Sequence, residues 1–592
     1  MPSRRIRRGF LMSKETDKIK KMDSWFRDAE EADTDWAARA KEDRDFYWSR
    51  QWAEEDKNKL TSQGRPVLTF NEIKPAVNLV SGIQRQNRTD IKVLSRTGDT
   101  HVGQVFSALI KEIEDQSNAE FEYSRQFLDG IIEGKGFLVF GVEYDKDIIN
   151  GDITIQREKP GRVKVDPSSE KYDISDAEYT IVESWHTKEK LKLQYPDKKE
   201  ELSLMKVRQG DTAAGKAVRD TGDYKGESRT LEGKDLDKNK IRAKTCWHRT
   251  FESKEFLYCS ETGEIKENTE KDKRAVYEWK RVQKKNGRTW ISVDNIVLPR
   301  LHCAIYAGDV MLQDVTDPIG KMTTIPVVPF FAYWDGDNCQ GMVADLKDPQ
   351  REVNKRHSQY LHLLNTSANS PWIMEEGSVP DESVYRNHGA TPGQLLKYNK
   401  GLDPAKIPHR MQAETPSQGH ILAEKLGEDF IKKISNVNAD LMGQMSSRGE
   451  PGIVVNARQR QGILGLEPLN DNFRYTRKLT GQLLIEMIQK GRTYDADEII
   501  TIIGRAGIEM KADIDEILNG INSGRHDAVV DMAVSTPTVR LANYYSLVEA
   551  VRAGVQIPPE MLLEANPDIP ETTKQQLREK MQTANPADIP GQ

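Results

Sequence analysis

The sequence is organised around one stretch, residues 341–377, which reads GMVADLKDPQREVNKRHSQYLHLLNTSANSPWIMEEG. Residues that are mostly apolar recur in it at steps of three and four, which predicts one long helix with a packing face. They are Leu346, Gln350, Val353, His357, Tyr360 and Leu364. A second stripe is basic and consists of Lys347, Arg351, Lys355 and His362. Such a helix can pack against a neighbour while it turns positive charge toward an anion, although an ordinary solvated surface helix would show the same charges.

The composition limits what the whole chain can bind. The chain has 592 residues, which is too long for one core, and its net charge is −6. Any contact with nucleic acid must therefore come from local basic patches rather than from bulk charge. We expect no membrane span, because no apolar run reaches the ~18 residues that a spanning helix needs. The four cysteines lack CxxC spacing, which favours free thiols in a reducing compartment.

The part of the chain before the opening stretch predicts a mixture of helices and strands. We expect an N-terminal helical arm over residues 1–60 and an α+β region over 61–186, in which Asn71 caps a helix and Gly134 ends another. Region 187–340 is predicted to hold a helix, a polar linker and a β region. Its helix spans Thr187 to Leu202, its linker spans 206–240, and its strands include one over Ala275 to Val282.

The part after the opening stretch predicts loops and helices. Residues 378–534 read as a loop-rich segment followed by helices at 418–442 and 456–492. Between these helices lies a glycine-rich tip that contains Arg448. Residues 535–592 predict short terminal helices.

No set of residues assembles an active site, a cofactor site or a metal site. The run Gly130-Ile-Ile-Glu-Gly134-Lys135-Gly136 looks like part of a phosphate loop. However, it follows a helix and precedes a strand, the wrong order for a helix N-terminus to face phosphate. The best enzymatic alternative is a metal-dependent nuclease or another DNA-processing phage enzyme that uses Asp345, Asp348 and Glu352. Ion pairs within the helix, such as Glu352 with Arg356, explain these carboxylates more simply.

The order of segments carries a resemblance. The run WSRQW at 48–52 is followed by GRPVLTFNEIKPAVNLVSGIQRQNRTDIKV, then GKGFLVFGVEYD, then VKVDPSSEKYDISDAEY, then IPVVPFFAYWDG and the opening helix. Together these segments resemble the portal proteins, or head-to-tail connectors, of tailed bacteriophages, in particular those of podoviruses. The resemblance covers roughly residues 40–580.

The resemblance implies a mixed α+β portal fold that assembles as a ring, usually of twelve subunits, at one capsid vertex of the virion. Such a fold has wing, stem, clip and crown regions. It implies 61–186 as wing, 187–340 as a possible first stem helix and β-containing clip, and 341–377 as the stem helix that follows the clip. Residues 378–534 would return to the wing, and 535–592 would form a helical crown.

The resemblance also implies a function without catalysis. The ring would form the channel for DNA packaging and DNA exit. Its partners would be double-stranded DNA held non-specifically, the terminase large subunit, capsid and scaffolding protein, and a tail adaptor, with assembly in the host cytoplasm. Another ring-forming virion component, such as an adaptor itself, is a third possibility, although adaptors are usually much smaller.

Two sets of residues follow as candidates for this function. A tunnel must hold a phosphate polyanion without gripping it, so sparse cations are the expected wall residues. The DNA-channel candidates are Lys347, Arg351, Lys355 and Arg448. A ring wall also needs heterologous packing of each helix on its neighbour. The subunit-packing candidates are Leu346, Val353, Tyr360 and Leu364.

Overall fold

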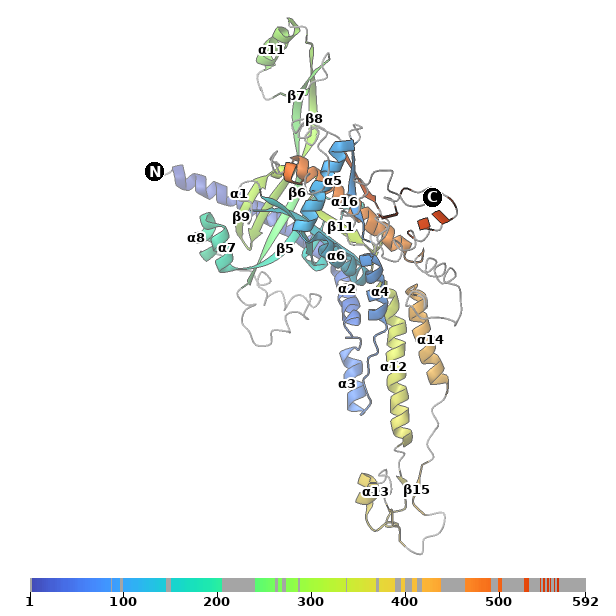
Figure 1. The fold of residues 1–592 in the computed structure, drawn as a ribbon. Coiled ribbons are helices and arrows are strands. Elements are labelled where there is room, and N and C mark those ends of the chain that lie inside the picture. The colour runs from blue at the N-terminus through green and yellow to red at the C-terminus, as the bar shows by residue number, and fades with distance from the viewer. Residues whose placement is uncertain are drawn as a thin grey trace.

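The structure is a computed structural model of the whole chain (Figure 1). It describes residues 3–86, 88–95, 100–144, 151–204, 240–260, 265–268, 273–285, 288–336, 338–368, 372–388, 395–399, 407–411, 418–437, 464–490, 499–502, 526–531 and a few single positions between 544 and 563. Arg448, residues 206–239 of the polar linker predicted at 206–240, and nearly all of the predicted C-terminal helices lie outside the described residues.

Helices and strands alternate along the chain, which confirms the α+β class. The helices are α1 (Ser3–Ala32), α2 (Thr34–Tyr47), α3 (Glu54–Ser62), α4 (Ile73–Gln86), α5 (Thr100–Gln116), α6 (Ala119–Glu133), α7 (Lys188–Gln194), α8 (Lys199–Leu204), α11 (Lys273–Lys285), α12 (Met342–Ala368), α13 (Glu382–His388), α14 (Gln418–Ile434) and α16 (Glu467–Lys490), with 3-10 turns η1 (Pro160–Arg162) and η2 (Pro196–Lys198). The strands are β1 (Asp90–Ser95), β2 (Lys135–Glu143), β3 (Asp152–Glu158), β4 (Val163–Val165), β5 (Tyr179–Thr187), β6 (Lys240–Cys259), β7 (Ile265–Glu267), β8 (Trp290–Ala307), β9 (Val310–Thr316), β10 (Pro318–Lys321), β11 (Val327–Phe331), β12 (Tyr333–Asp335), β13 (Asn338–Gln340), β14 (Trp372–Ile373), β15 (His409–Arg410) and β16 (His526–Asp531).

The main core lies where α4, α5, α6 and α16 meet the three-stranded sheet β11-β2-β3. Phe127 of α6 stacks on Phe330 of β11, and Phe473 of α16 packs edge-on against both rings. Burial of such aromatic side chains supplies much of the stability of a core. Asn71 Oδ1 accepts a hydrogen bond from Lys74 N at 3.1 Å, which confirms the predicted cap of α4.

A second sheet has the order β4-β5-β6-β8-β9, and β7 pairs with the outer part of β6. The first helix α1 covers it: Ile19, Met22 and Phe26 are buried there against Ile181 and Tyr306. The aromatic-rich arm is therefore anchored to a larger body, as its composition predicts.

Strands β6 and β8 continue beyond this sheet as a ribbon that projects from the body (Figure 1). At its end lies α11, where the sequence predicts a strand over Ala275–Val282, and that prediction is wrong. The physical reason lies in the apolar spacing. Val276 and Trp279 stand three residues apart, which is a helical period, and both pack on Leu257 and Trp290. The strand is predicted only because the neighbouring segments are rich in β-forming residues.

Two long helices, α12 and α14, run side by side away from the body, with α2, α3 and α4 beside α12 (Figure 1). We call α12 and α14 the stem hairpin. Gly427 of α14 permits their close approach, because a Cβ there would lie 2.8 Å from Val353 Cγ2. At the far end, between the two helices in the chain, lie β14, α13 and β15 (Figure 1).

Two expectations about the stem are wrong. Thr187–Leu202 does not form a stem helix: Pro196 interrupts it, and the two short helices α7 and α8 bury Leu191 and Leu202 against the edge of the second sheet. The β region ahead of residue 341 does not lie at the end of the stem either. It belongs to the second sheet and its ribbon, so the small unit at the end of the stem hairpin follows α12 instead of preceding it (Figure 1).

The stem joins the body at a junction of glycines. Gly134 adopts φ +88 and ends α6, and β2 begins at the next residue. A Cβ on Gly341 would lie 2.5 Å from Ile131 O and 2.6 Å from Ile132 O, so only glycine lets α12 begin against the last turn of α6. The run that resembles part of a phosphate loop is thus a packing element.

Gly341→Ala tests this junction. The new methyl group would meet backbone oxygens that cannot move aside alone, so we expect α12 to shift and the chain to lose about 1–3 kcal/mol of stability. Gly82→Ala in α4 is the matched control, because nothing lies within 4 Å of its Cβ position. It should stabilise the chain by up to about 1 kcal/mol. Thermal unfolding measures both changes, and equal effects would contradict the junction.

Candidate functional site

The basic stripe of α12 faces two helices of its own chain. Lys347 Nζ lies 2.7 Å from Glu42 Oε2 and 2.8 Å from Asp43 Oδ1, both on α2. Arg351 pairs with Glu42 and, at 2.6 Å, with Asp348. The structure therefore brings the first two DNA-channel candidates together, but it places them against carboxylates.

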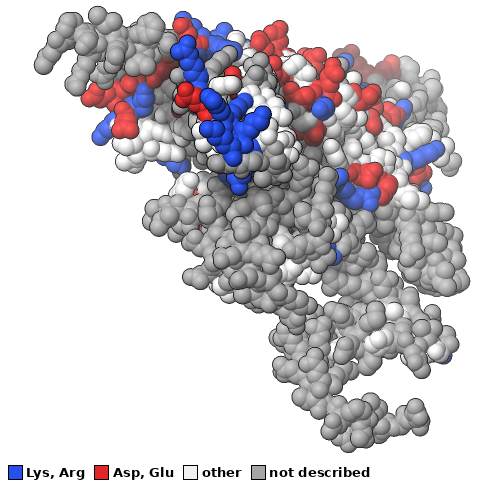
Figure 2. Space-filling view, turned by 90° about the horizontal axis from the view of Figure 1, so that it is seen from above, with Lys and Arg blue, Asp and Glu red and all other residues white. Residues whose placement is uncertain are grey.

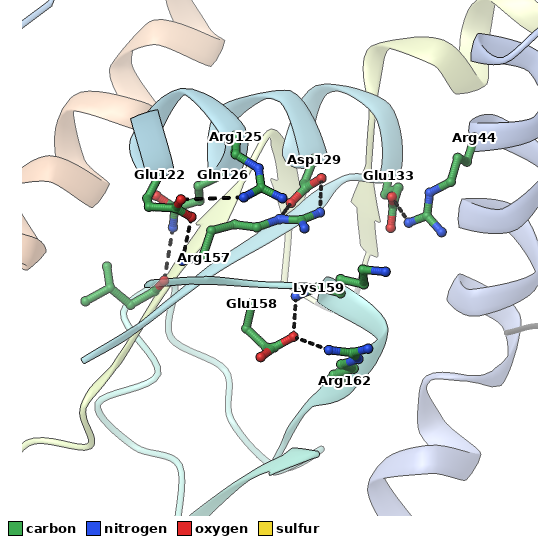
Figure 3. Close-up of polar contacts among 11 residues, drawn as sticks. Arg44, Glu122, Arg125, Gln126, Asp129, Glu133, Arg157, Glu158, Lys159 and Arg162 are labelled. Carbon is green, nitrogen blue, oxygen red and sulfur yellow. Dashed lines mark hydrogen bonds and ion pairs between the residues drawn. The ribbon is translucent and has the colours of Figure 1, made fainter. Parts of the chain in front are cut away.

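The helix that supplies these carboxylates is itself held by the body. Arg44 of α2 pairs with Glu133 at the end of α6 (Figure 3). Trp36 Nε1 donates a hydrogen bond of 2.8 Å to Glu133 O. One turn earlier in α6, Asp129 accepts two hydrogen bonds from Arg157 of β3, at 2.5 and 2.7 Å (Figure 3). A bidentate pair of this kind fixes geometry as well as charge, so α6 is a rigid base for α2.

Burial shapes the electrostatics of the Lys347–Asp43 pair. Burial lowers the pKa of Lys347, but hydrogen bonds to Asp43 and Glu42 and the charges of these residues outweigh burial, so the pKa lies above its ordinary value. Burial raises the pKa of Asp43, and Lys347 only partly opposes the rise. Because only 12% of the Lys347 side chain and 4% of that of Asp43 are exposed, the pair serves α12–α2 packing and leaves little charge for an outside anion.

The third cation, Lys355, differs from the first two. Its Nζ lies 3.8 Å from Asp56 Oδ2 of α3, and 58% of its side chain is exposed. An exposed pair at this distance holds its charges weakly. Lys355 also lines a cavity of ≈ 470 Å³ between α3 and α12. Its charge therefore remains accessible from outside the chain.

The apolar stripe of α12 divides in the same way. Leu346 and Val353 are 0% and 1% exposed and lie in the main core, so the prediction that they meet a neighbouring subunit is wrong. They are already covered by their own chain. Tyr360 is half-buried, and Leu364 is 39% exposed, so these two lie on the part of the helix beyond the body.

Polar residues of α12 hold the extended segment ahead of α4, a role that the sequence analysis does not predict. Three of them stand at steps of four and bind the extended segment ahead of α4. Gln350 Oε1 accepts from Glu72 N at 2.9 Å, Asn354 Oδ1 from Phe70 N at 2.9 Å, and Ser358 Oγ from Leu68 N at 3.2 Å. The spacing of these three polar residues within a packing stripe was the available signal, because buried backbone N–H groups need acceptors.

The carboxylates of the enzymatic alternative each have a protein partner. Gln340 Nε2 donates to Asp345 at 2.6 Å, Asp348 pairs with Arg351, and Glu352 pairs with Arg356 at 2.6 Å, the pair that the sequence predicts. Across the described residues no group of three or more His, Cys, Asp or Glu side chains could hold a metal ion. The arrangement favours ion pairs over a metal centre.

An apolar stripe on α14 was also missed. It consists of four side chains at steps of four, which are 62%, 47%, 50% and 43% exposed: Leu422, Leu426, Phe430 and Ile434. These four side chains lie on one flank of α14. The adjacent flank carries Gly427 and Ile431 and faces α12 and the core. A contiguous apolar stripe of this kind marks an interaction surface. The four-residue period was visible in the sequence of this helix, but not which flank stays exposed.

Lys347→Met tests the pairing of the stem with α2. Removal of the ammonium leaves Asp43 buried without its cation, so we expect a loss of about 3 kcal/mol at pH 7. The pKa of Asp43, already raised, should rise further. In the variant, the buried charge of Asp43 destabilises the fold at pH values above this raised pKa. Protonation removes that charge as the pH falls through the pKa, so the destabilisation should be smaller at pH 5. Thermal unfolding at both pH values measures this, and Lys347→Met with Asp43→Asn should recover most of the loss. A loss that does not depend on pH would contradict it.

Comparison with known proteins agrees with this arrangement. Among the described residues, no helix is both long and apolar enough to cross a membrane. No curated protein matches the chain. A family model described as phage P22-like portal protein matches residues 23–592, which is nearly the whole chain, from α1 through the body and stem hairpin to the C-terminus. This chain therefore belongs to the phage P22-like portal protein family, whose members are structural components of the phage portal.

Proposed function

We propose that copies of this chain form a closed ring, of twelve subunits by the resemblance, whose channel conducts double-stranded DNA into and out of the capsid. The family match supports the portal role. The observation that carries the ring is the exposed stripe Leu422, Leu426, Phe430 and Ile434 on α14. Apolar surface left in water disfavours a lone subunit, at about 25 cal/mol per Å².

A ring needs two different patches on each subunit, one for each neighbour. The stripe on α14 is the first. The second is the cavity of ≈ 470 Å³ between α3 and α12, which lies on the side of α12 away from α14 (Figure 1). Trp52, Leu60 and Leu363 contribute apolar atoms to its lining. We propose that the α14 stripe of one subunit packs on these apolar side chains of the next and leaves Lys355 open to the channel.

The channel wall would carry few accessible cations. Lys347 and Arg351 are paired within the chain, which leaves Lys355 as the candidate of α12 that can reach DNA. Arg448 stays a candidate that lies outside the described residues. Weak contacts of this kind suit passage, because each phosphate contact adds salt-sensitive affinity that movement must overcome.

The remaining parts of the proposal rest on the resemblance. The unit β14-α13-β15 at the end of the stem hairpin would be the clip, where terminase and then the tail adaptor dock. The body would be the wing that meets capsid and scaffolding protein. The ring would act without catalysis and without a cofactor, in the virion and, during assembly, in the host cytoplasm.

Leu426→Glu with Phe430→Glu tests the ring contact. Both side chains are about half exposed in the single chain, so the variant should fold as the unmodified subunit does. Two charges buried in a subunit contact would oppose assembly. We expect native mass spectrometry to show monomers in place of rings. Lys425→Glu with Lys433→Glu, at exposed positions beside the stripe, is the matched control and should still assemble. Intact rings from the first variant would refute the α14 contact.

Lys355→Gln tests the channel candidate. Because its ion pair with Asp56 is long and exposed, the change should leave stability within about 0.5 kcal/mol. We expect rings to form and to retain less packaged DNA in an assay of capsid filling. Lys347→Gln is not a suitable channel probe, since its charge is neutralised within the chain. Loss of rings from Lys355→Gln would instead assign this side chain to the subunit contact.

A further inference from the structure

The tip of the ribbon carries a concentration of positive charge that the stem does not explain. Between residues 273 and 288 the chain has seven Lys or Arg and one acidic residue, although its net charge is −6 overall. Most of this segment is α11, at the end of the ribbon opposite the stem hairpin (Figure 1). Figure 2, which views the molecule from that end, shows Lys and Arg side chains gathered in one patch.

The helix is held at the tip mainly by its apolar face, and Lys280 also donates a hydrogen bond to Ser292 of β8. Val276 and Trp279 pack on Leu257, Cys259 and Trp290, a cluster separate from the cores of the body. The rings of Trp279 and Trp290 lie 5.3 Å apart. This small cluster fixes which face of α11 turns outward.

The outward face is basic, and we call it the tip patch. It comprises four exposed cations, three on α11 and one just after it: Arg281, Lys284, Lys285 and Arg288. Within the described residues, none of the four lies within ion-pair distance of a carboxylate, in contrast to Lys347 and Arg351 of the stem. Tyr277, one helical turn before Arg281, is 69% exposed.

Two acidic residues of the described part of the ribbon are bound by other side chains. Glu252 pairs with Arg300 at 3.4 Å, and Glu255 Oε2 accepts a hydrogen bond from Asn268 at 3.1 Å. Both are occupied along the strands. Neither lies within ion-pair distance of the tip patch, whose four cations are exposed to solvent.

The ribbon also places the patch away from the body. Beyond Arg249 and Leu301 only β6 and β8 pair with each other until β7 joins at Phe256. About ten residues of strand at about 3.3 Å each give a reach of roughly 30 Å. A helix carried at that distance contributes nothing to the cores of the body, so a contact with another molecule would account for its place.

The chemistry of the patch favours nucleic acid over protein. Lysine is depleted at protein–protein contacts, and a stable contact needs about 800 Å² on each partner, which favours more than one short helix. Contacts to phosphate favour lysine and need no large contact area, because their affinity comes from counterion release by Lys and Arg. Tyrosine hydroxyls also contact phosphate and sugar.

We propose that the tip patch of α11 binds the phosphate backbone of double-stranded DNA without sequence preference, at a place separate from the channel. This contact goes beyond the proposed function, because it lies at the end of the molecule opposite the stem. Each subunit supplies one patch, so a ring would present as many patches as it has subunits. Simultaneous contacts of this kind add avidity to individually weak ones.

The experiment uses the full-length chain and covalently closed circular duplex DNA. Such DNA cannot thread a closed ring, so the channel residues of a ring do not contribute to binding. On single subunits, the comparison of the tip variant with its control isolates the tip patch. The tip variant replaces four residues with Gln: Arg281, Lys284, Lys285 and Arg288. The matched control replaces four exposed lysines elsewhere with Gln: Lys57, Lys190, Lys199 and Lys478. Both variants lose the same net charge.

We expect the unmodified chain to bind the DNA and the tip variant to bind at least tenfold more weakly near 0.1 M salt. The slope of log K against log salt should fall in magnitude by up to about 3.6, the value for four lost phosphate contacts. The control should bind within about twofold of the unmodified chain. If the tip variant matches the control, or the unmodified chain does not bind the DNA, the proposal is wrong. Binding of polyglutamate as tight as that of DNA would assign the patch to an acidic protein and also overturn it.

Two further measurements keep the result clear. Near-ultraviolet circular dichroism of the Trp279–Trp290 pair checks that the tip is folded. If the fourfold variant unfolds the tip, Lys284→Gln with Lys285→Gln should lower the slope by about half as much, and an unchanged slope would overturn the proposal.

Ring formation is measured separately by native mass spectrometry. Failure of the ring would refute the proposed function while the DNA titration still tests the tip patch on single subunits.

Discussion

The close approach of α12 to the last turn of α6 is the constraint on which the rest of the structure depends. It exists because Gly341 has no side chain to meet Ile131 O and Ile132 O, and because Gly134 turns the chain out of α6 at a positive φ. From this contact α12 takes its direction. The same α6 holds α2 through Glu133 and Arg44, so the stem and the helix that neutralises its cations share one base. The position of the stem is thus decided inside the body.

Local signals in the sequence predicted local structure well. The cap at Asn71, the glycine that ends α6 and the Glu352–Arg356 pair are confirmed. The helix predicted over 341–377 is confirmed over Met342–Ala368, but its predicted end is wrong, because Trp372–Ile373 form β14. Each depends on residues close together in the chain. The faces of α12 could not be assigned in this way, because Leu346 and Val353 are covered by α6, α14 and other distant segments. The partners of Lys347 lie about 305 positions earlier, on α2, and no pattern within the helix reveals them.

The two basic segments of the chain illustrate why charge alone is a poor guide to a site. The stripe on α12 stands out in the sequence, yet two of its three strongest members are neutralised by Glu42, Asp43 and Asp348. The segment that became α11 was read as a strand, because its β-rich flanks outweighed the three-residue apolar step of Val276 and Trp279. Accessibility of charge is a tertiary property. It depends on which carboxylates the fold brings within reach.

The pairing of β1 with β16 has a consequence for how the protein is made. Ser95 lies opposite His526, so 431 residues separate the two strands, by subtraction of their numbers. At about 5 to 20 residues per second, a ribosome needs roughly 20 to 90 s to travel that distance. During this time the first strand has no partner, and Glu114 also waits for Arg477. A subunit therefore completes its body only after β16 has been synthesised, which delays the appearance of an assembly-competent surface.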